Sequence, residues 1–157
     1  MKPTIGITDS NRQAVSNELA KLLADEYVLY TKTRNAHWNI EGPDFYDKHK
    51  FFEAQFGQLD EIVDSVAERI RSLGHYTPAT LKSFSELTHL TEESRSDNDS
   101  KGFIITLLKD HESIIIHLRE NINRFANEFN DAGTSDFITG LLKDHEKMAW
   151  FLRSHLK

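Results

Sequence analysis

One long helical pattern constrains this chain more than any other feature of its sequence. Between residues 44 and 73 there is no proline and a single glycine, Gly57. Apolar side chains recur there at intervals of three or four residues, the spacing of one face of an amphipathic helix: Phe45, Phe52, Phe56, Leu59, Ile62, Val63, Val66 and Ile70. The pattern predicts one continuous helix over about 44–73, with Gly74 as its C-terminal stop.

The polar face of this helix carries four potential metal ligands. At about 100° per residue, they fall within an arc of roughly 60°: His49, Glu53, Asp64 and Glu68. Along the axis, however, Glu53 and Asp64 are roughly 16 Å apart at about 1.5 Å per residue, whereas a metal ion holds its ligands at about 2 Å. One ion therefore cannot bridge both pairs within one helix.

Two copies of the helix can solve this problem. If they cross antiparallel about a two-fold axis near Gly57 and Gln58, the His49 end of one copy lies opposite the Glu68 end of the other. Such an isologous contact makes two identical sites, each shared between two chains, and the small Ala54 and Gly57 permit a close approach. The spacing thus suggests a metal site between two copies, although an acidic helix face is also often no more than solvated surface.

Three further segments have the same helical spacing of apolar residues, at about 10–37, 99–131 and 134–155. Gly42 and Pro43 interrupt the pattern between the first two helices. Because this interruption is short, we expect the first two helices to form an antiparallel hairpin.

The hairpin positions a fifth potential ligand. His37 lies at the end of the first helix, a short turn before the second helix, and so comes near the His49 end of the ligand face. We therefore expect His37, His49 and Glu53 to form one half of the metal site. The other half consists of Asp64 and Glu68 from a second copy.

Candidate caps and breaks mark the helix ends. Candidate N-terminal caps precede two of the helices: Thr8, Asp9 or the capping-box pair Ser10 and Gln13 for the first, and Asp44 for the second. We expect Ala132 and Gly133 to end the third helix, and the fourth to begin near Thr134 or Ser135.

The connection over 75–98 is long enough to run the length of a helical bundle. Leu81, Phe84 and Leu87 support one short helix inside it. The expected fold class is therefore all-α: a ferritin-like four-helix bundle with an up-down-down-up course and a short extra helix in the long crossover connection. The whole chain, residues 1–157, is expected to form a single domain.

Composition excludes several classes of site. The chain has no cysteine, which rules out disulfides, thiolate zinc sites and thiol catalysis. Its net charge is −6 at pH 7, and Lys2 is the only basic residue among the first eleven, so strong binding to DNA phosphates is not expected. No segment resembles a signal peptide or a membrane span, and we expect a cytoplasmic protein.

Glu86 and His89 have the Glu-x-x-His spacing that di-iron bundles of the ferritin and rubrerythrin kind carry on core helices. Here the motif lies in the connection and has no second copy. We interpret it as part of the surface.

The ligand pattern resembles the Dps family of bacterial miniferritins. Its core is His37-Trp38, Gly42 and Phe45, then His49, Glu53, Asp64 and Glu68-Arg69. The similarity extends over nearly the whole chain through the YTPATL segment at 76–81, Thr134-Ser135-Asp136 and Trp150.

This resemblance implies a dodecameric shell with ferroxidase sites at its two-fold interfaces. His37, His49 and Glu53 of one subunit would bind iron together with Asp64 and Glu68 of a second subunit. Family members oxidise Fe(II), typically with hydrogen peroxide in preference to oxygen. They deposit ferric oxyhydroxide inside the shell, which stores iron and protects against oxidative damage.

Two positions qualify the resemblance. In the family, acidic residues near the start of the last helix line three-fold pores; Asp136 matches that position, and Asp131 is a weaker match. Asp136 is equally well explained by stabilisation of the helix dipole. Position 53 is Glu where many relatives have Asp, which lengthens this ligand.

Three other functions are alternatives, and each has a requirement or a consequence that distinguishes it. Some relatives condense DNA with lysine-rich tails, which would require a basic terminus. An enzyme of the larger-ferritin or rubrerythrin kind holds its metal inside one bundle, and that requires paired Glu-x-x-His motifs on core helices. A structural bundle with a merely solvated acidic face would form no ferric core when Fe(II) and peroxide are added.

Overall fold

The computed structural model describes residues 3–92, 95 and 97–157. Its regular structure is helical, without a strand in those ranges, and consists of α1 (Asp9–Asn39), α2 (Phe45–Ser72), α3 (Leu81–Leu87), α4 (Ser100–Asn123), the π-helical turn η1 (Arg124–Glu128) and α5 (Ala132–Ser154).

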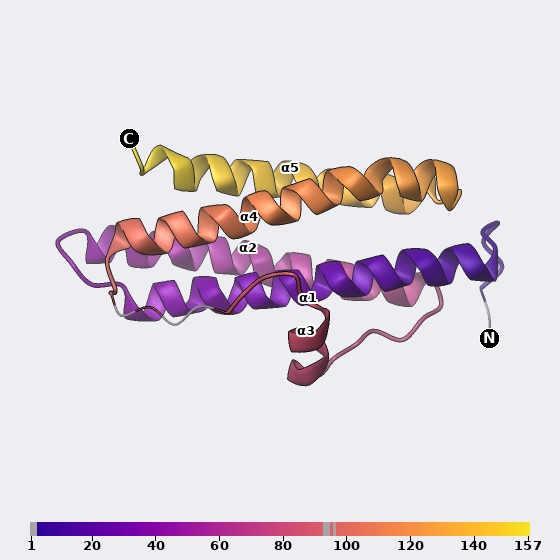
Figure 1. Cartoon of the computed structure of the whole chain (residues 1–157), viewed down its shortest axis with the longest axis horizontal. Coiled ribbons are helices and arrows are strands. Elements are labelled where there is room, and N and C mark those ends of the chain that lie inside the picture. The colour runs from indigo at the N-terminus through magenta and orange to yellow at the C-terminus, as the bar shows by residue number, and fades with distance from the viewer. Residues whose placement is uncertain (1–2, 93–94, 96) are drawn as a thin grey trace.

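The four long helices run side by side, and α3 lies outside the bundle against α1 (Figure 1). α1 and α5 run in one direction and α2 and α4 in the other, so the course is up-down-down-up (Figure 1). The link through α3 carries the chain back along the outside of the bundle, from the end of α2 to the start of α4. The predicted all-α bundle with a short extra helix in its crossover is confirmed.

The first helix begins at the cap that one of the three alternatives predicted. Thr8 is extended, and its hydroxyl accepts a hydrogen bond from the backbone N of Asn11 at 3.2 Å. The capping box of Ser10 and Gln13 does not form, because Ser10 already lies inside α1; the Gln13 amide donates to Asn17 at 2.8 Å. One free N–H group of the first turn is thereby satisfied by Thr8.

The predicted stop of α2 is also observed. Gly74 has a φ of 88°, a backbone conformation that residues other than glycine rarely adopt. A Cβ at this position would lie 2.6 Å from the ring of Pro3. At the other end, Asp44 occupies the cap position, but its side chain makes no cap hydrogen bond. Its carboxylate lies 3.8 Å from Lys48 instead.

The end of α4 differs from the sequence prediction of one helix to about residue 131. The α-helix ends at Asn123, and a π-helical turn follows in which the N of Phe129 donates to the O of Arg124 at 3.1 Å. Asn130 then takes a φ of 53°, in the left-handed region that asparagine tolerates better than most residues. These local features turn the chain toward α5.

Asp131 begins the last helix. Its carboxylate accepts hydrogen bonds from the backbone N of Thr134 at 2.8 Å and from the Thr134 hydroxyl at 2.5 Å, and it lies 3.5 Å from Arg69. Ala132 and Gly133 therefore form the first turn of α5, and the prediction that they end the preceding helix is wrong.

The bundle encloses an apolar core, and a line of hydrogen-bonded polar side chains lies inside it. Phe52 and Phe125 are among the largest fully buried side chains. Between α1, α4 and α5, His145 Nε2 donates to the Glu26 carboxylate at 2.7 Å, and its Nδ1 lies 2.9 Å from Nδ1 of His111. Burial, and then the proximity of His145, holds the pKa of His111 well below its usual value, so this imidazole is neutral at pH 7. Among the described helices, none is long and apolar enough to cross a membrane.

Asp131 provides a test of this account of the α5 start. We expect Asp131→Ala to lower the free energy of unfolding by about 1–2 kcal/mol, because it removes the cap of α5. Asp136→Asn, at an exposed position one turn further along α5, should change it by no more than about 0.5 kcal/mol. Urea unfolding of both variants measures the difference, and equal stabilities would contradict the capping role.

Candidate metal centre

Two histidines join the end of α1 to the start of α2. His37 Nδ1 donates to the backbone carbonyl of His49 at 2.8 Å, and His49 Nδ1 donates to the carbonyl of His37 at 2.8 Å. The two rings stack, with centroids 3.8 Å apart and planes at 20°. The short hairpin thus brings together two residues that the sequence predicted to lie close.

These hydrogen bonds determine which nitrogen of each ring can bind a metal. A carbonyl oxygen only accepts, so Nδ1 carries the proton in both rings. The neutral form of each imidazole then has its lone pair on Nε2. A ring held through Nδ1 by a backbone carbonyl is the usual arrangement of a metal-binding histidine.

Aromatic side chains surround the pair. Phe45 stacks on His49 with ring centroids 5.2 Å apart, and Phe56 makes a T-shaped contact with His37, with ring centroids 5.0 Å apart. Arg34 lies over Phe56 and over Trp38, at 4.4 Å and 5.1 Å from the ring centroids. His37 itself is buried, so the rings are fixed by packing as well as by hydrogen bonds.

Glu53 lies one turn along α2 from His49. It is exposed, and its carboxylate accepts from Lys50 at 2.7 Å. The bond to Lys50, the charge of Lys50 and, more weakly, His37 and His49 lower the pKa of Glu53. The side chain is therefore a carboxylate ion at neutral pH, as a metal ligand must be.

Asp64 and Glu68 are exposed on the other half of α2. Neither carboxylate forms an ion pair with another described residue. At about 1.5 Å per residue, Asp64 is roughly 16 Å from Glu53 along the helix axis. One chain therefore places His37, His49 and Glu53 at one end of α2, without bringing their ligand atoms all within 4.8 Å of one another, and places Asp64 and Glu68 at the other end.

The two predicted pore residues occupy different environments. Asp136 is exposed on α5. Asp131 is only 2 % exposed, and it caps α5 and contacts Arg69. These contacts explain Asp131 without a pore.

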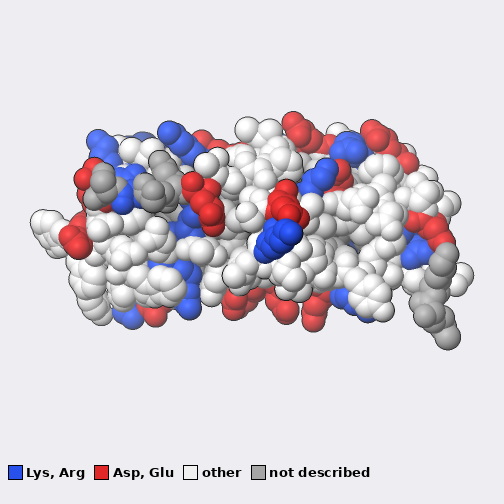
Figure 2. Space-filling view, turned by 60° about the horizontal axis from the view of Figure 1, so that its bottom comes forward, with Lys and Arg blue, Asp and Glu red and all other residues white. Residues whose placement is uncertain are grey.

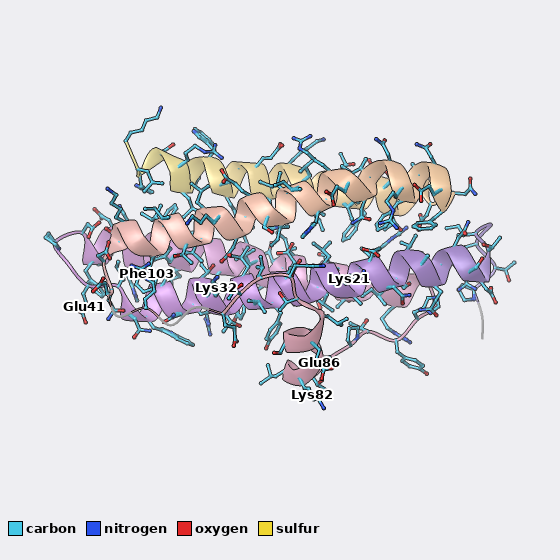
Figure 3. The ribbon with its side chains drawn as sticks, viewed as in Figure 1. Lys21, Lys32, Glu41, Lys82, Glu86 and Phe103 are labelled. Atoms are coloured by element: carbon cyan, nitrogen blue, oxygen red, sulfur yellow. The ribbon has the colours of Figure 1, made fainter. Side chains whose placement is uncertain are left out.

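The structure also assembles a group that the sequence did not reveal. Among the described residues, one set of three or more potential ligands has ligand atoms that all lie within 4.8 Å of one another: Asp25, His89 and His117. His89 belongs to the Glu-x-x-His motif interpreted as surface. Glu86 fits that interpretation, since it is exposed on α3 beside Lys82, on the side away from α4 and α5 (Figure 3).

Known proteins resemble this chain over its whole length. The ferritin-like domain family matches residues 16–157. A low temperature-induced protein of Nostoc sp. is 41% identical over 98% of this chain and 86% of its own. DNA protection during starvation protein 2 of Bacillus anthracis is 33% identical over 93% of this chain and 98% of its own.

Solved structures agree with this assignment. The Dps protein of Vibrio cholerae O1 superposes with a TM-score of 0.92 at 29% identity, covering 100% of this chain and 98% of its own. It is described as a member of a broad superfamily of ferritin-like diiron-carboxylate proteins. The chain therefore belongs to the ferritin-like domain family and, within it, to the Dps proteins.

Proposed function

We propose that this protein is a ferroxidase and iron-storage miniferritin. Copies of the chain would form a dodecameric shell, oxidise Fe(II) with hydrogen peroxide and deposit ferric mineral inside. The observation that carries this proposal is the pair His37 and His49, whose Nε2 atoms are left available, with Glu53 one turn along α2 from His49.

The remaining ligands would come from a second subunit. Two α2 helices that cross antiparallel about a two-fold axis near Gly57 place Asp64 and Glu68 of one copy opposite His49 and Glu53 of the other. Gly57 is exposed, and a Cβ there would meet nothing within 4 Å. The middle of α2 is thus open at Gly57, as such a crossing requires.

Exposed aromatic side chains near the histidine pair support the same arrangement. Trp38 and Tyr46 are 63% and 69% exposed in the single chain, and Phe45 is 44% exposed. Neighbouring exposed apolar side chains of this size mark interaction surfaces. A second subunit would cover them and exclude water from the metal.

The ligand chemistry suits oxidation of iron. Two imidazoles and three carboxylates can hold Fe(II), and the anionic oxygens stabilise the Fe(III) product. Two Fe(II) ions each lose one electron; hydrogen peroxide takes up both electrons and two protons and becomes two molecules of water. Iron is the substrate of this reaction, and we propose Asp136, exposed on α5, as part of its entry path.

Two variants of His49 distinguish the roles of its two ring nitrogens. Asn places an amide N–H where Nδ1 was but has nothing at Nε2. We expect His49→Asn to slow rapid Fe(II) oxidation by about tenfold or more, while the bond to the His37 carbonyl is kept. His49→Ala should slow oxidation equally and also lose about 1 kcal/mol of stability. Peroxide-pulse kinetics and urea unfolding measure the two effects; fast oxidation in His49→Asn would exclude Nε2 as a ligand.

Mixed assemblies test whether the site is shared. One chain carries His37→Asn and His49→Asn, the other Asp64→Asn and Glu68→Gln, and neither should oxidise Fe(II) rapidly alone. When both are co-expressed in equal amounts, random two-fold pairing should restore roughly a quarter of the wild-type sites. Initial oxidation rates per subunit give this fraction.

A matched control mixes the same histidine variant with a second chain that carries Glu53→Gln in place of Asp64→Asn and Glu68→Gln. Both chains are then damaged in the same half of the site, so mixing should restore nothing. Restoration in the control as well, or in neither mixture, would contradict a site completed by two subunits.

DNA condensation is the competing function, since a relative is named for DNA protection. Lys and Arg side chains are scattered among Asp and Glu on the face that carries α3 and form no continuous basic stripe there (Figure 2). With a net charge of −6, we expect negligible retardation of duplex DNA in a gel shift at physiological salt. A tight, salt-sensitive complex would favour the DNA-binding role.

A further inference from the structure

Three segments far apart in the sequence meet at one point on the side of the bundle. Asp25 lies on α1, His89 follows α3 in the crossover link, and His117 lies on α4. Each offers one ligand atom, and these atoms all lie within 4.8 Å of one another. A mononuclear metal ion can reach three ligands at this separation after small side-chain movements.

The carboxylate of Asp25 is held in a defined orientation. It is only 2% exposed, and its Oδ1 accepts hydrogen bonds from the backbone N of His89 at 2.6 Å and from the Thr88 hydroxyl at 2.7 Å. Oδ1 is therefore engaged with the link. Oδ2 faces the His89 ring, 3.3 Å from its Nδ1.

A simple ion pair between Asp25 and His89 does not account for the third residue. The His117 ring lies 4.6 Å from the His89 ring, measured between centroids. Its Nδ1 is buried and has no hydrogen-bond partner among the described residues. A buried polar atom without a partner is costly, and a metal ion or a water molecule that an ion holds would satisfy it.

The surroundings leave room for further ligands. The three residues border a cavity of about 270 Å³, which Glu18, Lys21 and Glu120 also line. Water molecules can therefore complete the coordination sphere of an ion bound there. The charges of Glu18 and Lys21 are paired, at 3.0 Å, so the cavity itself is not strongly acidic.

We propose that Asp25, His89 and His117 bind one divalent transition metal ion of the class that prefers mixed nitrogen and oxygen ligands, such as Zn²⁺ or Co²⁺. Two imidazoles and one carboxylate with open positions are a known ligand set for such ions. The site is separate from the His37 set, since Asp25 and His37 are roughly 18 Å apart along α1 at about 1.5 Å per residue. The bound ion would fasten the crossover link to α1 and α4.

Binding is measured on the assembled protein with Zn²⁺ by calorimetry and with Co²⁺ by its visible absorption. Both ions keep their oxidation state, so the measurement does not depend on iron oxidation. The measurement uses a background variant with His37→Asn and His49→Asn, which lacks the two imidazoles of the proposed ferroxidase site. In that background we expect one strong site per chain and a rise in melting temperature on saturation with Zn²⁺.

Variants of each ligand test the assignment. Asp25→Asn keeps the acceptor for the link but removes the charge, and His89→Ala changes a half-exposed side chain, so neither should unfold the bundle. Each, like His117→Gln, should weaken Zn²⁺ binding by about tenfold or more and abolish the rise in melting temperature. His155→Ala, an exposed histidine outside both sets, and Glu86→Gln are the matched controls and should bind as the background does.

Unchanged affinity in Asp25→Asn and His89→Ala would overturn the proposal. So would an equal loss of binding in His155→Ala, because it would indicate adsorption to surface histidines in general.

Discussion

Two reciprocal hydrogen bonds between α1 and α2 determine the chemistry of the histidine pair. The carbonyl of His37 is one of the last four of α1, which have no partner within the helix. The residue four positions on, Glu41, donates its N–H to Asn98 instead. His49 Nδ1 supplies the missing donor, and His37 Nδ1 binds the second lone pair of the His49 carbonyl. The same bonds therefore close the hairpin and leave both Nε2 lone pairs unengaged, before any metal is bound.

The centre of the bundle contains a similar set of residue types but in a different arrangement. Glu26, His145 and His111 form a line in which His145 uses both of its nitrogens for hydrogen bonds. A metal could take either nitrogen only by breaking one of these bonds in a fully buried site. The low pKa of His111 keeps this chain from gaining a further charge at neutral pH. Glu26, His145 and His111 thus form a structural hydrogen-bond chain in the interior.

Local sequence was sufficient for most of the fold and for the contact between His37 and His49. Apolar spacing predicted the long helices, and a short break at Gly42 and Pro43 placed His37 beside His49. The π-helical turn could not be predicted, because it depends on the left-handed Asn130 and on Asp131 bonding to Thr134. These are local choices that many sequences could make in other ways.

The second ligand group was hidden for a different reason. Asp25 and His89 are 64 residues apart and share no helix. No spacing rule connects them. The Glu-x-x-His pattern instead pairs His89 with Glu86, which is exposed on α3. Only the path of the crossover link along α1 brings His89 to Asp25. Sequence periodicity can align ligands on one helix, but it cannot show where a long link will return.

The two proposed ligand sets differ most in charge, and this difference assigns them different chemistry. The set proposed to be shared between two subunits would bring three carboxylates to an ion, which would balance the three positive charges of Fe(III) as well as the two of Fe(II). Asp25, His89 and His117 bring one carboxylate, and the charges of the other two acids that line the cavity, Glu18 and Glu120, are balanced by those of Lys21 and Arg124. An ion that gained a third positive charge there would keep two positive charges that the single, buried Asp25 carboxylate does not balance. The proposed shared site would therefore suit a metal in both its divalent and its trivalent state, whereas the site of Asp25, His89 and His117 favours an ion that remains divalent.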